Sequence, residues 1–252
     1  MTFNVPAASY ARFIGRFSEL LAAQFADLAA IRTGQRALDV GCGPGALTAQ
    51  LVERLGAGAV HAIDPSAPFV AAARARFPGV HVRPGTAEQM PFADDAFDAA
   101  LAQLVVHFMT DPVAGLAEMA RVTRPGGVVA ACVWDHAGGT GPLAAFWRAV
   151  QDLDPGAQDE SGLPGARKGH LAQLCEAAGL NDIESSSLTV TVAFETFDDW
   201  WEPFTLGVGP GGAYVASLGP GRRAALRSRC EELLPVAPFT VDGSAWCVRA
   251  HP

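Results

Sequence analysis

The stretch ALDVGCGPGALT, residues 37–48, decides the fold of this chain. Three glycines, Gly41, Gly43 and Gly45, stand within five positions, after a short apolar run and before a run rich in alanine and leucine. A short apolar run bounded by glycine is typical of a buried strand, and the run that follows has helical spacing. The stretch therefore predicts a strand, a glycine-rich turn and a helix, and the ligand of that turn is the key to function.

Strand and helix patterns alternate on both sides of this stretch. Apolar runs typical of buried strands occupy residues 36–40, 59–64, 80–84, 97–106 and 127–134, and helical patterns occupy residues 45–55, 66–76 and 112–123. Such alternation predicts a parallel sheet with helices on both faces. A helical pattern over 9–30 precedes it, and helical patterns over 143–151 and 168–178 and β-rich segments over 183–194 and 239–250 follow it.

Composition narrows the class of protein. The chain has 252 residues, enough for one large α/β domain, and its formal charge of −8 comes without a basic stripe. This negative charge argues against a protein that binds the phosphates of nucleic acid and against an anionic membrane surface as partner. The five cysteines lack the spacing of a metal site or a redox pair. The N-terminal stretch does not have the pattern of a signal peptide, and the sequence has no run of about 18 apolar residues. We therefore expect a cytoplasmic protein without a metal site.

The glycine turn has two interpretations. Gly41, Gly43 and Ala46 fit the G-x-G-x-x-G/A fingerprint of dinucleotide-binding folds. Asp64 ends the next strand, close to the place where an acidic residue takes ribose hydroxyls in those folds. An oxidoreductase that uses a nicotinamide or flavin is therefore an alternative at this point.

Two residues favour a different ligand. Asp39 ends the first strand, and a carboxylate aimed into the turn repels a pyrophosphate but attracts a cation. Pro44 removes a backbone N–H, the group from which phosphate cradles are built. A ligand with an ammonium group, a ribose and no phosphate suits both residues, and S-adenosylmethionine has that description.

Several stretches carry a resemblance to a known family. ALDVGCGPGALT resembles the first motif of the class I S-adenosylmethionine-dependent methyltransferases, and AIDPSAPFVAAARARF (62–77) resembles their acidic second motif. The long stretch from RPGTAEQM to RPGGVV (83–129) resembles their third to fifth motifs, in the ubiquinone/menaquinone-biosynthesis-like branch. YARFIGRFS (10–18) resembles the leader helix of that branch. The resemblance covers residues 9–135.

The resemblance implies an architecture. We expect a Rossmann-like sheet of seven mostly parallel strands, the last antiparallel, with helices on both faces, an N-terminal helix and a helical lid insert. A single methyltransferase domain would span residues 1–252. Within it we expect an N-terminal cap helix in 1–35, a cofactor-binding core in 36–135 and the lid insert in 196–235, between the last two strands.

The resemblance also implies the cofactor contacts. Asp39 would act on the ammonium group of S-adenosylmethionine, and Asp64 would accept from both ribose hydroxyls. Thr86 departs from the family, because many relatives carry an acidic residue there. Tyr10 and Arg16 would close over the methionine carboxylate. The full set expected to bind the cofactor is Asp39, Gly41, Gly43, Asp64, Pro65, Ala87, Glu88, Gln103, Leu104, Tyr10 and Arg16.

The candidate catalytic residues follow the fourth and fifth strands. A methyl transfer needs an aligned acceptor and excluded water, and it needs a base only when the acceptor must lose a proton. His107, at the carboxyl end of the fourth strand, is the leading base candidate. Its alternative role is structural, under the following helix. His136 and Asp135 after the fifth strand are further catalytic candidates, with simple solvation as their alternative.

Aromatic side chains gather in the second half of the chain. They would form an apolar wall around the acceptor, or they simply pack the core of a small helical subdomain. The candidate acceptor-binding residues are Trp134, Phe146, Trp147, Trp200, Trp201 and Phe204.

These features together predict an S-adenosylmethionine-dependent methyltransferase. It would transfer a methyl group, by in-line displacement, to oxygen, carbon or nitrogen of a small-molecule acceptor. The alternatives are a nicotinamide-dependent oxidoreductase, a protein that uses S-adenosylmethionine for other chemistry, and a binding protein without catalysis.

Overall fold

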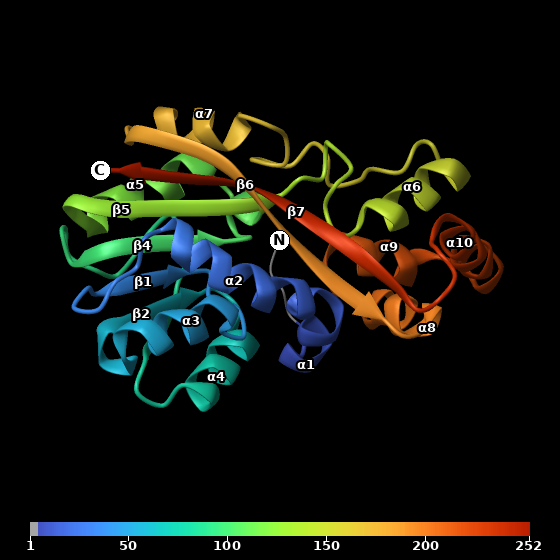
Figure 1. The fold of residues 1–252 in the computed structure, drawn as a ribbon, viewed down its shortest axis with the longest axis horizontal. Helices are drawn as coiled ribbons and strands as arrows, with labels where there is room; N and C mark the ends of the chain where they lie inside the picture. Colours follow the sequence, from blue (N-terminus) through green and yellow to red (C-terminus); the bar gives the residue numbers. More distant parts are fainter. Residues whose placement is uncertain (1–4) are drawn as a thin grey trace.

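The structure is a computed structural model that describes residues 5–252, and its framework is one seven-stranded sheet (Figure 1). The strand order is β3-β2-β1-β4-β5-β7-β6. Strands β1 to β5 pair in parallel, and β7 is antiparallel to both of its neighbours. The strands are β1 (Ala37–Val40), β2 (Val60–Asp64), β3 (His81–Pro84), β4 (Phe97–Gln103), β5 (Thr123–Trp134), β6 (Asn181–Phe194) and β7 (Phe239–His251). The expected sheet is therefore confirmed.

Helices cover both faces of the sheet. The N-terminal segment, α3 and α4 pack on one face, and α5 and α7 pack on the other. The helices and turns around the sheet are α1 (Ala7–Tyr10), the π-helical turn η1 (Ala11–Gly15), α2 (Arg16–Leu28), α3 (Ala46–Leu55), η2 (Ala57–Ala59), α4 (Ala67–Arg76), η3 (Val106–Phe108), α5 (Pro112–Val122), α6 (Ala144–Leu153) and α7 (His170–Ala177). The first four residues of the expected cap helix, 1–4, lie outside the described residues.

A helical group stands between the last two strands. It consists of α8 (Phe197–Trp201), η4 (Glu202–Leu206), α9 (Gly209–Ser217) and α10 (Pro220–Leu233). Figure 1 shows it together with α6 at the far ends of β6 and β7, beyond the edge of the parallel strands. Gly207 directly follows η4 and Gly209 begins α9, and their φ angles are 71° and 62°.

The side-chain alternation of β1 explains how one strand serves two cores. Leu38 and Val40 belong to the apolar cluster under α5 and α7, and Ala37 belongs to the cluster under the N-terminal helices. Asp39 therefore projects from the same face as Ala37, because side chains two residues apart share a face of a strand. This places a carboxylate inside the sheet–helix interface immediately before the glycine turn.

Candidate cofactor and acceptor site

The turn after β1 requires glycine for two different reasons. Gly41, Gly43 and Gly45 have φ angles of 69°, 54° and 97°, in the left-handed region that favours glycine. A Cβ at Gly41 would collide with both γ-carbons of Val105, 2.6 Å from Cγ1 and closer to Cγ2. A Cβ at Gly43 would meet no atom within 4 Å. Gly41 therefore allows close packing, whereas Gly43 leaves open space beside the turn.

The Asp64 carboxylate joins the two turns at this edge of the sheet. Gly43 N–H donates to Oδ2 at 2.8 Å, and Ser66 N–H donates to Oδ1 at 2.7 Å. Burial raises the pKa of Asp64, and these two N–H donors oppose the rise. Each carboxylate oxygen has a second lone pair, so Asp64 can still accept two hydrogen bonds from a ligand.

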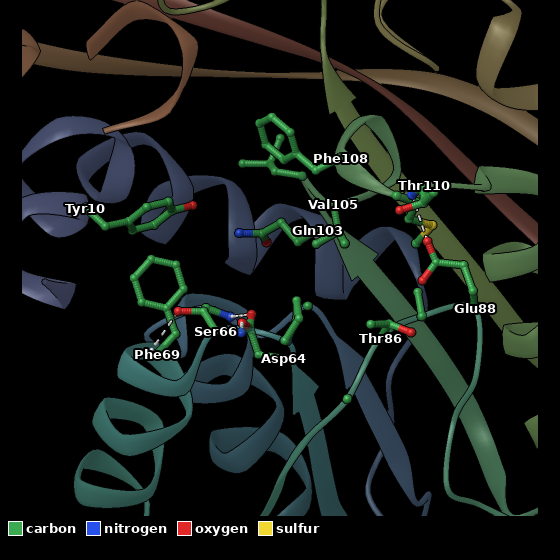
Figure 2. Close-up of a pocket in the computed structure, with 17 residues that line it drawn as sticks. Tyr10, Asp64, Ser66, Phe69, Thr86, Glu88, Gln103, Val105, Phe108 and Thr110 are labelled. Carbon is green, nitrogen blue, oxygen red and sulfur yellow. Dashed lines mark hydrogen bonds between the residues drawn. The ribbon is translucent and has the colours of Figure 1, made fainter. Parts of the chain in front are cut away.

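A cavity of about 220 Å³ opens at the carboxyl ends of β1, β2 and β4 (Figure 2). Two carboxylates, Asp64 and Glu88, line it, and it has no Lys, Arg or His among its described lining residues. We call it the first cavity. Its lining residues are Tyr10, Gly41, Gly43, Asp64, Pro65, Ser66, Phe69, Gly85, Thr86, Ala87, Glu88, Gln103, Leu104, Val105, Phe108, Met109 and Thr110.

Gln103 and Tyr10 face each other across the first cavity (Figure 2). Gln103 Nε2 donates to the carbonyl oxygen of Ser18 at 3.0 Å, which fixes the orientation of the amide. Its Oε1 is buried and accepts no hydrogen bond within the described part of the chain. A buried acceptor without a partner costs free energy, so this position suits a ligand that brings an N–H or O–H group.

Asp39 lies behind the turn rather than in the cavity wall. It is 1% exposed and accepts a hydrogen bond from Thr48 Oγ1 on α3 at 2.5 Å. Burial raises the pKa of Asp39 to about 7; the Thr48 hydroxyl lowers it, and the Asp64 charge adds to the rise. Any action of Asp39 on a ligand in the first cavity is therefore through its charge, at a distance.

The structure gathers most of the expected cofactor residues around the first cavity. Asp39 and Arg16 are the two that do not line it. The Arg16 guanidinium instead donates to Asp199 at 3.1 Å and to the carbonyl oxygen of Ala193 at 2.6 Å, which holds it against β6 and α8. The residues that sequence reasoning missed include Phe69 and Val105, although Phe69 occupies the first turn of the predicted helix after Asp64.

A second cavity, of about 40 Å³, adjoins the first. The two share Tyr10, Leu104 and Phe108 in their walls. The second cavity is mostly apolar, and its polar lining residues are His107, His136, Glu160, Tyr10 and Trp134. The start of α9 closes it with Val208, Gly209 and Pro210. We therefore regard it as the candidate acceptor site.

Two uncharged imidazoles stand at the second cavity. The rings of His107 and His136 are 5.9 Å apart between centroids. Burial, with a smaller contribution from the His136 charge, lowers the pKa of His107 well below its ordinary value. Burial also lowers the pKa of His136 to about 4, against the opposing charges of Asp135 and Asp159. His107 Nδ1 and His136 Nε2 are buried and have no partner among residues 5–252.

The Asp135 carboxylate accepts hydrogen bonds from residues of its own loop. Gly138 N–H donates to Oδ1 at 2.8 Å, and Thr140 Oγ1 donates to Oδ2 at 2.7 Å. Asp135 is 4% exposed, so simple solvation does not describe it. Its contacts fix the loop that presents His136.

Some of the candidate aromatic residues line a cavity, and others lie in the apolar core. Trp134 lines the second cavity, and its Nε1 has no partner in the described structure. Phe146 is fully buried and stacks on Phe204 at 4.3 Å between ring centroids. Trp200 and Trp201 are buried against Phe204 as well. These four residues line neither of the two cavities, because they pack on one another between α6 and the helical group.

Comparisons with known proteins point to methyltransferases. Residues 38–131 match the family described as "Methyltransferase domain". The chain is 36% identical over 127 residues to the malonyl-[acyl-carrier protein] O-methyltransferase of Erwinia billingiae, covering 50% of this chain and 49% of that protein. It is 40% identical over 101 residues to the demethylmenaquinone methyltransferase of Beutenbergia cavernae, covering 40% of this chain and 41% of that protein.

A solved structure shows the same fold over nearly the whole chain. It is a putative methyltransferase from Bacillus halodurans, with a TM-score of 0.58 and 20% identity, covering 91% of this chain and 97% of that one. Residues 38–131 therefore match a methyltransferase domain, and the chain as a whole shares the fold of a solved methyltransferase structure. It spans about half the length, or less, of the curated relatives named above. In residues 5–252, every helix is too short or too polar to cross a membrane.

Proposed function

We propose that this protein transfers the methyl group of S-adenosylmethionine to a small-molecule acceptor. The observation that carries the proposal is the charge of the first cavity, which has two carboxylates, a glycine turn and no basic side chain in its described wall. A dinucleotide brings two phosphates and would meet repulsion there. S-adenosylmethionine brings an ammonium and a sulfonium, which the carboxylates attract.

The residues present fit the cofactor. Asp64 has lone pairs left for the two ribose hydroxyls, and the open space beside Gly43 lets a ligand approach the backbone. The unpartnered Gln103 Oε1 suits the ammonium. When bound, the cofactor supplies an activated methyl group on sulfur.

Further residues complete the proposed cofactor contacts. We assign Pro65 and Ala87 to the adenine, and Glu88 holds the loop below it by accepting from Thr110 N–H at 2.8 Å. Tyr10 and Leu104 separate the cofactor from the second cavity, since both line the two cavities.

On the acceptor side, we propose that His107 and His136 contact the substrate as uncharged hydrogen-bonding groups and that Asp135 positions His136 through its loop. The rings of Trp134 and Phe108 form an apolar wall, which excludes water from the reacting atoms. The second cavity is small in this structure. We therefore propose that the helical group of 196–235 is a lid that moves at Gly207 and Gly209 to admit the acceptor.

Calorimetric titration tests the cofactor assignment. S-adenosylhomocysteine should bind with a Kd on the order of 1 μM, and NAD should show negligible binding. Asp64→Ala should weaken S-adenosylhomocysteine binding, whereas Glu53→Ala, which removes an exposed carboxylate on α3, should not. Tighter binding of NAD than of S-adenosylhomocysteine would favour the oxidoreductase alternative and overturn the proposal.

A further inference from the structure

Glu160 is a buried carboxylate that neither the cofactor contacts nor the fold of the sheet uses. It is 3% exposed, and it belongs to the irregular segment between α6 and α7. Trp147 Nε1 donates to its Oε2 at 2.8 Å. Its Oε1 accepts no hydrogen bond within the described residues, although the side chain lines the second cavity.

The position of Glu160 is between two cavities. Glu160 and His136 line the second cavity and also a third cavity of about 420 Å³, whose wall includes Ala144, Trp147 and Gln151 of α6. The first, second and third cavities thus follow one another, joined by shared wall residues. A molecule in the second cavity would lie between the cofactor and Glu160.

The charged side chains along this path are mostly carboxylates. The described wall of the second cavity contains one carboxylate, two uncharged imidazoles and no Lys or Arg. The third cavity adds Asp135 and Asp159 against a single Arg148. An anionic acceptor in the second cavity would lie beside the Glu160 carboxylate with no cation in the described wall to pair it, which is unfavourable.

The other residues in the wall of the second cavity suit a ligand that joins a cationic group to an apolar one. Phe13, Phe108 and Trp134 present aromatic surface to the second cavity, and aromatic faces attract ammonium groups. Resting on the proposed function, we infer that Glu160 is an acceptor-binding residue and that the second cavity selects an amine carried on a small apolar body.

Glu160 can also accept the proton that the ammonium group of the acceptor must lose. An ammonium nitrogen has no lone pair, so it must lose a proton before it can attack a methyl group. Proton transfer from the ammonium to Oε1 leaves an uncharged amine and an uncharged carboxylic acid, and it removes the repulsion between ammonium and sulfonium.

The protonation equilibria favour this residue over the imidazoles. Burial raises the pKa of Glu160 to about 7, against the hydrogen bond from Trp147, and the Asp159 charge adds to the rise. The pKa values of His107 and His136 are lowered instead. Of the three groups, Glu160 therefore holds a proton most strongly near neutral pH.

Three probes with one hydrophobic body test the inference: 2-phenylethylamine, 2-phenylethanol and 3-phenylpropionate. Their binding is measured by ligand-observed NMR on the full chain, with and without S-adenosylhomocysteine. We expect the amine to bind at least about tenfold more tightly than the alcohol, and the acid not to bind. Glu160→Gln should abolish the preference for the amine, because the amide still accepts from Trp147 but carries no charge.

Asp159→Asn is the matched control. Asp159 is the adjacent carboxylate, lines only the third cavity and already accepts from Ser161 through Oδ1. Its substitution should change the amine affinity by less than about twofold, and S-adenosylhomocysteine affinity should stay the same in all three proteins.

Three outcomes would overturn the inference. They are binding of the acid as tightly as the amine, an unchanged preference in Glu160→Gln, and no binding of the amine to the unmodified protein up to about 10 mM. The order of the three probes on the unmodified protein decides the matter even if Glu160→Gln fails to fold. If the unmodified protein bound the three probes in the expected order but did not bind S-adenosylhomocysteine, the result would instead count against the proposed cofactor.

Discussion

Alanine substitutions at Gly41 and Gly43 should have different costs, although the two glycines belong to one turn. Both have positive φ, and a left-handed conformation costs an alanine about 1–2 kcal/mol. At Gly41 the new methyl would also collide with Val105, and overpacking adds about 1–3 kcal/mol. At Gly43 nothing stands within 4 Å of the new Cβ. The expected losses in free energy of unfolding are thus about 2–5 kcal/mol for Gly41→Ala and about 1–2 kcal/mol for Gly43→Ala.

Urea denaturation without ligand measures both losses, and a second background isolates the collision. Val105→Ala removes the two γ-carbons that a methyl at Gly41 would strike. In that background the cost of Gly41→Ala should fall towards the conformational part, about 1–2 kcal/mol, because only the 3.1 Å contact with the Cβ of residue 105 remains. Equal costs for the two glycines, or a Gly41→Ala cost that Val105→Ala leaves unchanged, would refute this account of the turn.

The two glycine substitutions should also differ in their effect on ligand binding. A methyl at Gly43 would project into the space beside the turn, at the wall of the first cavity. We therefore expect Gly43→Ala to weaken S-adenosylhomocysteine binding by more than its small loss of stability suggests. Unchanged affinity in Gly43→Ala would show that the ligand does not approach this backbone.

Asp64→Ala should weaken S-adenosylhomocysteine binding by about 1.5–3 kcal/mol for each hydrogen bond lost to a charged group, and unchanged calorimetric affinity would contradict the ribose assignment. The Asp39 pKa of about 7 means that its charge develops as pH rises from 6 to 8. S-adenosylmethionine should therefore bind more tightly at pH 7 than at pH 6, a range in which an α-amino group of pKa about 7.7–8 stays mostly charged, and Asp39→Asn should remove that dependence in the same titrations. Phe146→Ala should lower the free energy of unfolding by about 3–5 kcal/mol in urea denaturation, and a loss below 1 kcal/mol would mean that its site collapses. Hydrogen exchange in residues 196–235 should slow when cofactor and acceptor analogue are both bound, and equal protection in all states would exclude a lid.

The order of strands and helices was readable from the sequence because it depends on local information. Short apolar runs bounded by Gly, Pro or Asp became β1, β2, β4 and β5 within a few residues of the expected positions. Asp111 and Pro112 predict the start of α5 for a similar reason, since an Asx cap and a proline at the first helical position act on their own backbone. The parallel arrangement then brings the ends of β1, β2 and β4 to one edge, which places Gly41, Asp64 and Gln103 together.

Contacts between distant segments were decided only by the tertiary structure. Arg16 is drawn to Asp199, 183 residues away, so a residue expected at the cofactor instead ties the N-terminal segment to α8. Asp39 pairs with Thr48 across the turn and loses its place in the cavity wall.

Glu160 is the clearest case, because its segment has the acidic, glycine-rich and proline-rich composition of a solvent-exposed loop. Packing against Trp147 buries its carboxylate beside an apolar cavity. Burial and long-range pairing depend on which surfaces the folded chain brings together. Periodicity and local motifs carry no information about that choice, and the tertiary structure therefore decides the proposed acceptor side of this site.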